Sequence, residues 1–224
     1  MLLVFLIGTY LLSAFNGTTL ATQVQVILFA MILLLGLRSS PLPGRWPLVI
    51  AAVAVTGTAV AFSTSLAGTR TATGAEDLWK ALMLLLTVVM VVRRVLAKPT
   101  VTIQSIYGAL SAYLIIGLMF AAGYAAIEHL GESDFFASSQ PANTQTFQYF
   151  SFTTLTTLGY GDFTAAENGG RSIAVIEAMT GQVFLATLVA RLVTAYRGPA
   201  RPEPSGRGRL PEDVDGPGDD EDRD

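Results

Sequence analysis

Cysteine is absent from this chain of 224 residues, and histidine occurs once, at position 129. The lack of cysteine excludes disulfide bonds and thiolate metal sites. The sequence also shows no metal-ligand cluster, no nucleophile–base pair and no phosphate-binding loop, so we expect neither an enzyme nor a resident cofactor. Nothing in the composition indicates a nucleic-acid partner.

Charged residues are also scarce, at 14% of the chain, whereas 51% of the residues are hydrophobic and the mean hydropathy is +0.51. Such a composition predicts an all-α integral membrane protein. The net charge of −3 conceals an uneven distribution, because nine of the 17 acidic residues follow Arg201. The apolar part of the chain is therefore slightly basic.

Six apolar stretches are predicted to cross the cell membrane as helices, at about 1–15, 21–37, 48–67, 78–92, 101–127 and 172–196. A signal peptide competes for the first stretch but lacks the usual basic start. Residues 39–47, which contain three prolines, and the polar residues 68–77 are predicted loops.

Basic residues predict the orientation, because cytoplasmic loops carry an excess of lysine and arginine. With six spans, one side holds seven basic residues and the other holds three, Arg70, Lys80 and Arg171. The first set is Arg38, Arg45, Arg93, Arg94, Lys98, Arg191 and Arg197. Both termini are then cytoplasmic, and the segment before the sixth span lies near the outer face.

That segment contains Thr156-Thr157-Leu158-Gly159-Tyr160-Gly161-Asp162, preceded by a hydroxyl-rich run. Non-helical backbone at membrane depth is tolerated only where it is buried in protein or lines a water-filled path. Gly159 and Gly161 reach backbone angles that turn successive carbonyls to one side, where they can replace the water shell of a cation. One strand supplies too few oxygens, so this interpretation requires a homotetramer.

Thr157 to Asp162 resembles the selectivity filter of tetrameric potassium channels, usually written TVGYGD. The resemblance implies K⁺ sites at Thr157, Leu158, Gly159 and Tyr160, with Gly161 completing the filter. Leu158 replaces the commoner valine, but only its carbonyl would face the ion. The likeness covers about residues 101–197.

The same resemblance implies a re-entrant pore helix from Asn143 or Thr144 to about Thr156, with its C-terminal carbonyls pointing toward the cavity. Thr156 and Asp162 would support the filter, and the Tyr149 hydroxyl is hypothesised to bond Asp162. Simple packing is the alternative for Tyr149. In the outer loop, 128–143, His129 is expected to be solvated, with a pH-sensing role as the alternative.

In the sixth span, the resemblance places Gly181 at a gating hinge, with a packing glycine as the alternative. It places Gln182, Leu185 and Val189 along the cavity, and Val193 toward the inner constriction. Glu177 is an ionisable residue within a span and by default a functional candidate. It is hypothesised to brace the filter by accepting bonds from pore-helix threonines, or else to be buried in its protonated form.

The predicted organisation is a four-span membrane module, 1–98, a pore domain, 99–197, and a disordered acidic cytoplasmic tail, 198–224. The fourth span is uncharged between Lys80 and Arg93, so strong voltage gating is not expected. The sequence thus predicts a potassium-selective channel. The alternatives are a non-conducting accessory or sensor subunit, and a potassium-uptake transporter subunit, which usually carries four such loops per chain.

Overall fold

The computed structural model describes residues 3, 6–8, 46–65, 68–97, 102–137 and 140–196. Almost all of the first two predicted spans, Lys98 and the acidic tail lie outside these residues. The described part of the chain has five helices of twelve or more residues. These are α3 (Trp46–Ser65), α4 (Arg70–Ala97), α5 (Ile103–Leu130), α6 (Thr144–Leu155) and α7 (Asn168–Tyr196).

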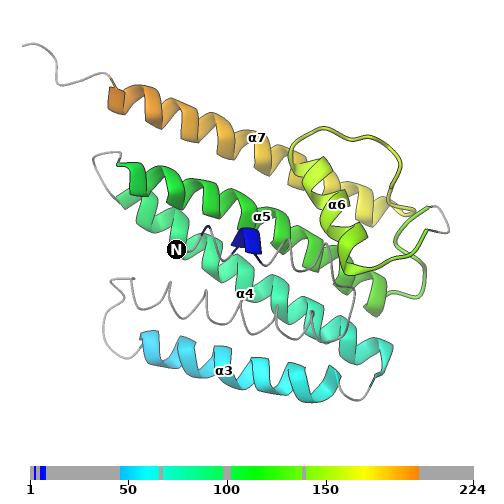
Figure 1. The fold of residues 1–224 in the computed structure, drawn as a ribbon. Coiled ribbons are helices and arrows are strands. Elements are labelled where there is room, and N and C mark those ends of the chain that lie inside the picture. Colours follow the sequence, from blue (N-terminus) through cyan, green and yellow to red (C-terminus); the bar gives the residue numbers. More distant parts are fainter. Residues whose placement is uncertain are drawn as a thin grey trace, which may run out of the picture.

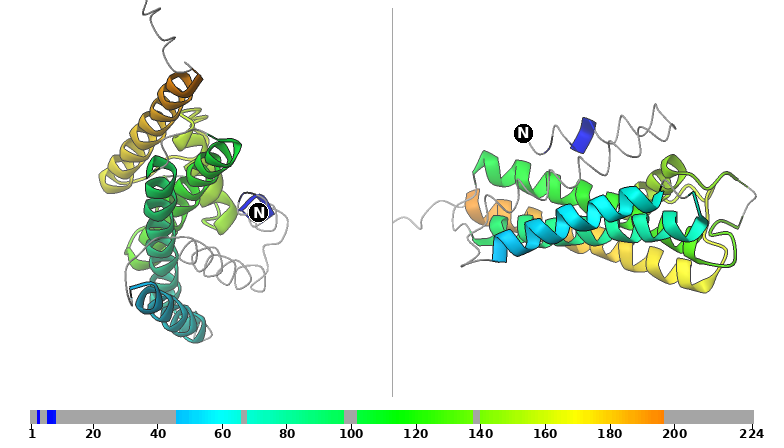
Figure 2. Two further views of the ribbon diagram at one scale, coloured as in Figure 1. Left: turned by 90° about the vertical axis from the view of Figure 1, so that its left-hand side faces the viewer. Right: turned by 90° about the horizontal axis from the view of Figure 1, so that it is seen from below.

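Four of these helices lie side by side in the order α3, α4, α5, α7, as Figures 1 and 2 show. The short helix α6 lies beside one end of α5 and α7 and contacts both helices. The most extensive packing is between α4 and α5. The predicted boundary between membrane module and pore domain is therefore a closely packed helix pair.

Helix α4 begins earlier than predicted, because residues 70–77 are helical and not a loop. The Thr69 hydroxyl accepts a bond from the Ala72 amide, which satisfies a free donor of the first turn. Lys80 then pairs with Glu76 at 3.1 Å and with Asp77 at 2.8 Å, one helical turn away. These local bonds offset the polar composition that indicated a loop.

Two helices of the described part are long and apolar enough to cross a membrane, residues 103–130 and 168–194. They correspond to the predicted fifth and sixth spans, with ends that differ from the predicted ones by two to four residues. The first is well buried within the chain, whereas only 11% of the most apolar segment of the second is buried. Helix α7 thus leaves most of its surface uncovered. Six spans remain a prediction.

Candidate functional site

Helix α6 has a well-defined start and points its end at the glycine-tyrosine-glycine motif. Its N-cap is Asn143, as predicted, and its side chain accepts a bond from the Thr146 amide at 3.0 Å. The Thr146 hydroxyl in turn accepts one from the Asn143 amide at 2.9 Å. The helix ends at Leu155, directly before the motif.

An aromatic cluster holds α6 against α5 and the outer loop. Its buried rings belong to Tyr124, Phe135, Phe136, Phe147 and Phe150. The outer loop is also tied to the chain after the motif, because the Ala166 amide donates to the Phe135 carbonyl at 2.8 Å and the Ala137 amide to the Thr164 carbonyl at 2.9 Å. The motif is therefore anchored on both sides.

Within the motif, every second residue has left-handed backbone. Thr157, Gly159 and Gly161 have φ angles of 58°, 52° and 78°, and the residues between them do not have positive φ. Alternating left- and right-handed residues straightens the chain and turns successive carbonyls toward one side. A β-branched residue with positive φ is unusual, so this backbone conformation at Thr157 could not be predicted from the residue type.

The amide groups of the motif point back to the end of α6. The Thr153 carbonyl accepts bonds from the Leu158 amide at 2.8 Å and the Gly159 amide at 3.1 Å, and the Thr154 carbonyl accepts one from the Thr157 amide at 2.9 Å. The Leu155 carbonyl accepts a bond from the Tyr113 hydroxyl at 3.3 Å. The last carbonyls of α6 therefore accept hydrogen bonds, and their orientation toward a cavity stays a prediction.

Tyr149 and Asp162 form the hydrogen bond hypothesised from the sequence. The Tyr149 hydroxyl donates to Asp162 Oδ2 at 2.8 Å, and this bond raises the pKa of the hydroxyl, which stays protonated at neutral pH. The Tyr149 ring stacks on Tyr160, with centroids 6.4 Å apart and planes 9° from parallel. One side chain thus contacts the motif at two points. Its effect on conduction stays a prediction.

We expect Tyr149→Phe to leave assembly intact and to shorten the conducting periods of single channels. The substitution keeps the stacked ring but removes one exposed hydrogen bond to a carboxylate, a small change for the fold as a whole. Single-channel recording in planar bilayers measures the open lifetime, and gel filtration checks assembly. Open lifetimes equal to those of the parent would reject a filter-supporting role.

Glu177 lies fully buried at the junction of α5, α6 and α7. Its Oε2 accepts a bond from the Tyr124 hydroxyl at 2.6 Å, and its Oε1 lies 2.5 Å from the Ser151 hydroxyl. The partners are thus a serine of α6 and a tyrosine of α5, not the threonines hypothesised. The Ser151 hydroxyl also lies 2.7 Å from the Gly117 carbonyl.

Gly181 lies where α7 passes closest to the end of α6. A Cβ at this position would overlap the Leu155 carbonyl oxygen and lie 3.0 Å from Leu155 Cδ1. This geometry gives a concrete reason for glycine whether or not the helix bends there. A hinge at Gly181 stays a prediction.

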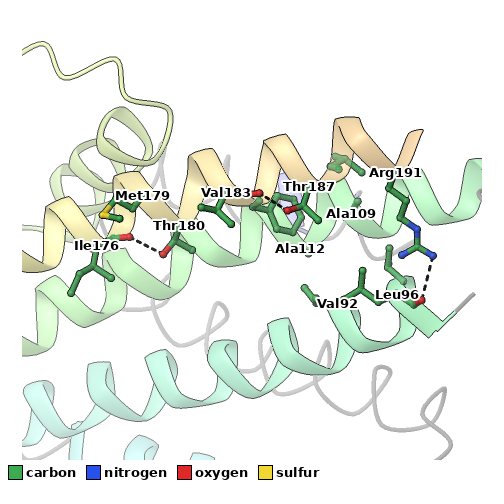
Figure 3. Close-up of a pocket in the computed structure, with 13 residues that line it drawn as sticks. Val92, Leu96, Ala109, Ala112, Ile176, Met179, Thr180, Val183, Thr187 and Arg191 are labelled. Carbon is green, nitrogen blue, oxygen red and sulfur yellow. Dashed lines mark hydrogen bonds between the residues drawn. The ribbon is translucent and has the colours of Figure 1, made fainter. Parts of the chain in front are cut away.

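Behind α7 lies an apolar groove of about 550 Å³, bounded by α4 and α5 (Figure 3). At one end the Arg191 guanidinium donates to the Leu96 carbonyl at 3.4 Å. Helix residues are about 100° apart, so the groove residues and the predicted cavity residues occupy opposite faces of α7. The groove residues on α7 include Ile176, Thr180, Val183 and Thr187. The face with Gln182, Leu185 and Val189 stays exposed in the single chain.

A polar cluster joins the start of α4 to the end of α5. His129 Nδ1 lies 2.9 Å from Asp77 Oδ2, so the expectation of a solvated histidine is wrong. Arg70 donates to Glu128 Oε1 at 3.3 Å, and Glu128 Oε2 accepts the Phe135 amide at 2.6 Å. The two ion pairs were not predicted from the sequence because their residues lie 52 and 58 positions apart. Their only signal in the sequence was that acidic and basic residues occur together at a helix end.

The comparisons with known proteins bear on the second half of the chain. Residues 112–197 match a family model. Its description is ion channel. The ion channel match covers most of α5, all of α6, the motif and α7, and is well under half of the chain. It supports a pore-loop channel function for these helices and suggests a protein that is not an enzyme. No match was found among curated proteins or among solved structures.

Proposed function

We propose that this chain forms a homotetrameric potassium channel of the cell membrane, with both termini cytoplasmic. K⁺ passes passively along Thr157 to Gly161, and adjacent ions repel one another through successive carbonyl sites. The observation that carries the proposal is the alternating backbone of the motif, with positive φ at residues 157, 159 and 161. This is the conformation that places a row of carbonyls on one side of a strand.

The need for four copies is supported by the large apolar side chains that a single chain leaves exposed. Leu158 is 55% exposed and Tyr160 is 66% exposed, although both lie between two helices long enough to cross a membrane. Large apolar side chains of α7, among them Met179 and Val189, are exposed on the same chain. Packing around a shared axis covers these surfaces and completes the ring of oxygens.

Weak voltage dependence follows from the charges of α4. Lys80 is buried and paired with two acidic residues of its own helix, so its charge is compensated locally. Arg93 and Arg94 are exposed near the end of the helix. Each charge moved across the membrane contributes only ~2.3 kcal/mol per 100 mV, and a strong sensor needs several such charges. We therefore expect flux that changes little with voltage.

The proposal is tested by K⁺ flux from liposomes that contain the purified protein. We expect flux that discriminates against Na⁺, is blocked by Ba²⁺ and falls by more than about tenfold in Gly159→Ala. Alanine at φ 52° is strained by about 1–2 kcal/mol in each copy, although a Cβ meets no atom within 4 Å. Gly123→Ala is the matched control, because a Cβ there also meets nothing within 4 Å and its backbone is helical.

Three results would contradict the proposal in different ways. Flux that passes Na⁺ as well as K⁺ would reject potassium selectivity while keeping a channel. No flux from a tetramer confirmed by light scattering, at several voltages and pH values, would favour the accessory subunit. A monomeric or dimeric particle that still transports K⁺ would reject the four-fold filter and reopen the transporter alternative.

A further inference from the structure

The side chain of Gln182, on α7, contacts Thr157 near the start of the motif. Its Nε2 donates a hydrogen bond to Thr157 Oγ1 at 3.1 Å, and the two residues are 25 positions apart in the chain. Gln182 follows Gly181, where α7 lies against the end of α6. The close approach of the two helices therefore brings this amide to the Thr157 hydroxyl.

The Thr157 hydroxyl can donate one hydrogen bond and accept two. It donates its only hydrogen to the Thr156 carbonyl at 2.7 Å. A hydroxyl oxygen accepts two bonds, and the Gln182 amide takes one of them. One lone pair is left for an ion. The amide hydrogens also bring partial positive charge close to the position that this ion would occupy, which disfavours a cation there.

The bond is not needed to hold α7 in place. Packing of Gly181 on Leu155 and the buried contacts of Glu177 already attach this part of α7 to α6. Gln182 itself is exposed in the single chain, and its backbone is ordinary helix. An exposed amide directed at a hydroxyl is better explained by an effect on what the hydroxyl binds.

We propose that Gln182 lowers the cation affinity of the innermost site of the filter by occupying the Thr157 hydroxyl, with one amide from each of four chains. This inference rests on the proposed function, because it takes Thr157 to be an ion ligand. A weaker innermost site lets an ion leave toward the cavity more readily. Gln182 is thus a positioning residue that acts through Thr157.

The test measures Ba²⁺ binding to the purified tetramer in NaCl by isothermal titration calorimetry, which requires no flux. Ba²⁺ is a dication of about the size of K⁺, so it reports the charge at the site strongly. We expect Gln182→Met, which keeps the length of the side chain but removes the donor, to bind Ba²⁺ about tenfold more tightly than the parent. Thr187→Val is the matched control, since its hydroxyl bonds the Val183 carbonyl of its own helix at 2.7 Å.

A double-mutant cycle separates this role from a general change in the cavity. Thr157→Val removes the hydroxyl and keeps the branched shape, so adding Gln182→Met to it is expected to leave the Ba²⁺ affinity unchanged. Equal or weaker binding by Gln182→Met alone would overturn the inference. So would tighter binding that persists in the Thr157→Val background, because the amide would then act without the hydroxyl.

Failure of this inference and failure of the proposed function give different results. Potassium-selective flux in liposomes together with unchanged Ba²⁺ affinity in Gln182→Met keeps the channel and rejects the role of Gln182. If neither the parent nor Gln182→Met binds Ba²⁺, no innermost cation site exists and the inference is rejected. The liposome flux still decides whether the protein conducts K⁺.

Discussion

Replacing Glu177 with alanine is expected to lower K⁺ flux by at least about tenfold and to weaken the folded tetramer. The substitution removes the buried carboxyl group that bonds Tyr124 and Ser151 and leaves a cavity between α5, α6 and α7. The Tyr124 hydroxyl, fully buried, would lose the partner it has in the structure. Each lost bond costs ~1 kcal/mol and the cavity adds to this, so the loss is about 3 kcal/mol in each chain. Flux in liposomes and thermal unfolding in detergent measure the two effects.

Glu177→Gln is expected to keep most of the flux, because glutamine can supply the hydrogen that the contacts of Ser151 require. Ser151 has one hydroxyl hydrogen but two oxygen neighbours, Glu177 Oε1 and the Gly117 carbonyl. Both short distances are satisfied if a protonated Glu177 donates to Ser151, which donates to Gly117. A glutamine amide can make the same pattern. Equal losses in the glutamine and alanine variants would show that the carboxylate charge is required, and flux equal to the parent in both would reject the brace.

Gly181→Ala is expected to produce the second large effect, a loss of both stability and flux. A Cβ there would overlap the Leu155 carbonyl oxygen, which is backbone and cannot rotate away. Overpacking of this kind costs about 1–3 kcal/mol in each chain and pushes α7 away from the end of α6. Because Gln182 is the next residue, we also expect its bond to Thr157 to break. Thermal unfolding and liposome flux are the measurements.

Gly169→Ala is the matched control for this substitution. Gly169 is in the first turn of α7, and a Cβ there meets no atom within 4 Å. We expect it to resemble the parent in both assays. A Gly181→Ala protein with normal thermal stability but altered opening would contradict the packing argument and favour the hinge instead.

The helices around the motif could be predicted because local signals define them. Asn143 caps α6 as expected, and α5 and α7 follow the apolar stretches to within a few residues at each end. The bond between Tyr149 and Asp162 was expected from the family resemblance, and the two residues lie only 13 positions apart. In each case the residues that decide the feature are neighbours in sequence.

The contacts that could not be predicted connect distant parts of the chain. Tyr124 meets Glu177 across 53 positions, and His129 meets Asp77 across 52. A tyrosine within an apolar span is a signal for a buried polar partner, but it does not name that partner. The same holds for the start of α4, where the pairing of Asp77 with His129 helps to bury residues that would otherwise favour a loop.

The hydrogen bonds between α6 and the motif couple the dipole of the helix to the peptide groups of the motif. The peptide groups whose amides bond the Thr153 carbonyl are those whose own carbonyls belong to Thr157 and Leu158. A peptide hydrogen-bonded at its N–H holds more negative charge on its oxygen, because bonds in a chain polarise one another. In the proposed channel, the negative end of the α6 dipole therefore acts on an ion through these peptides and strengthens the oxygens proposed to bind it.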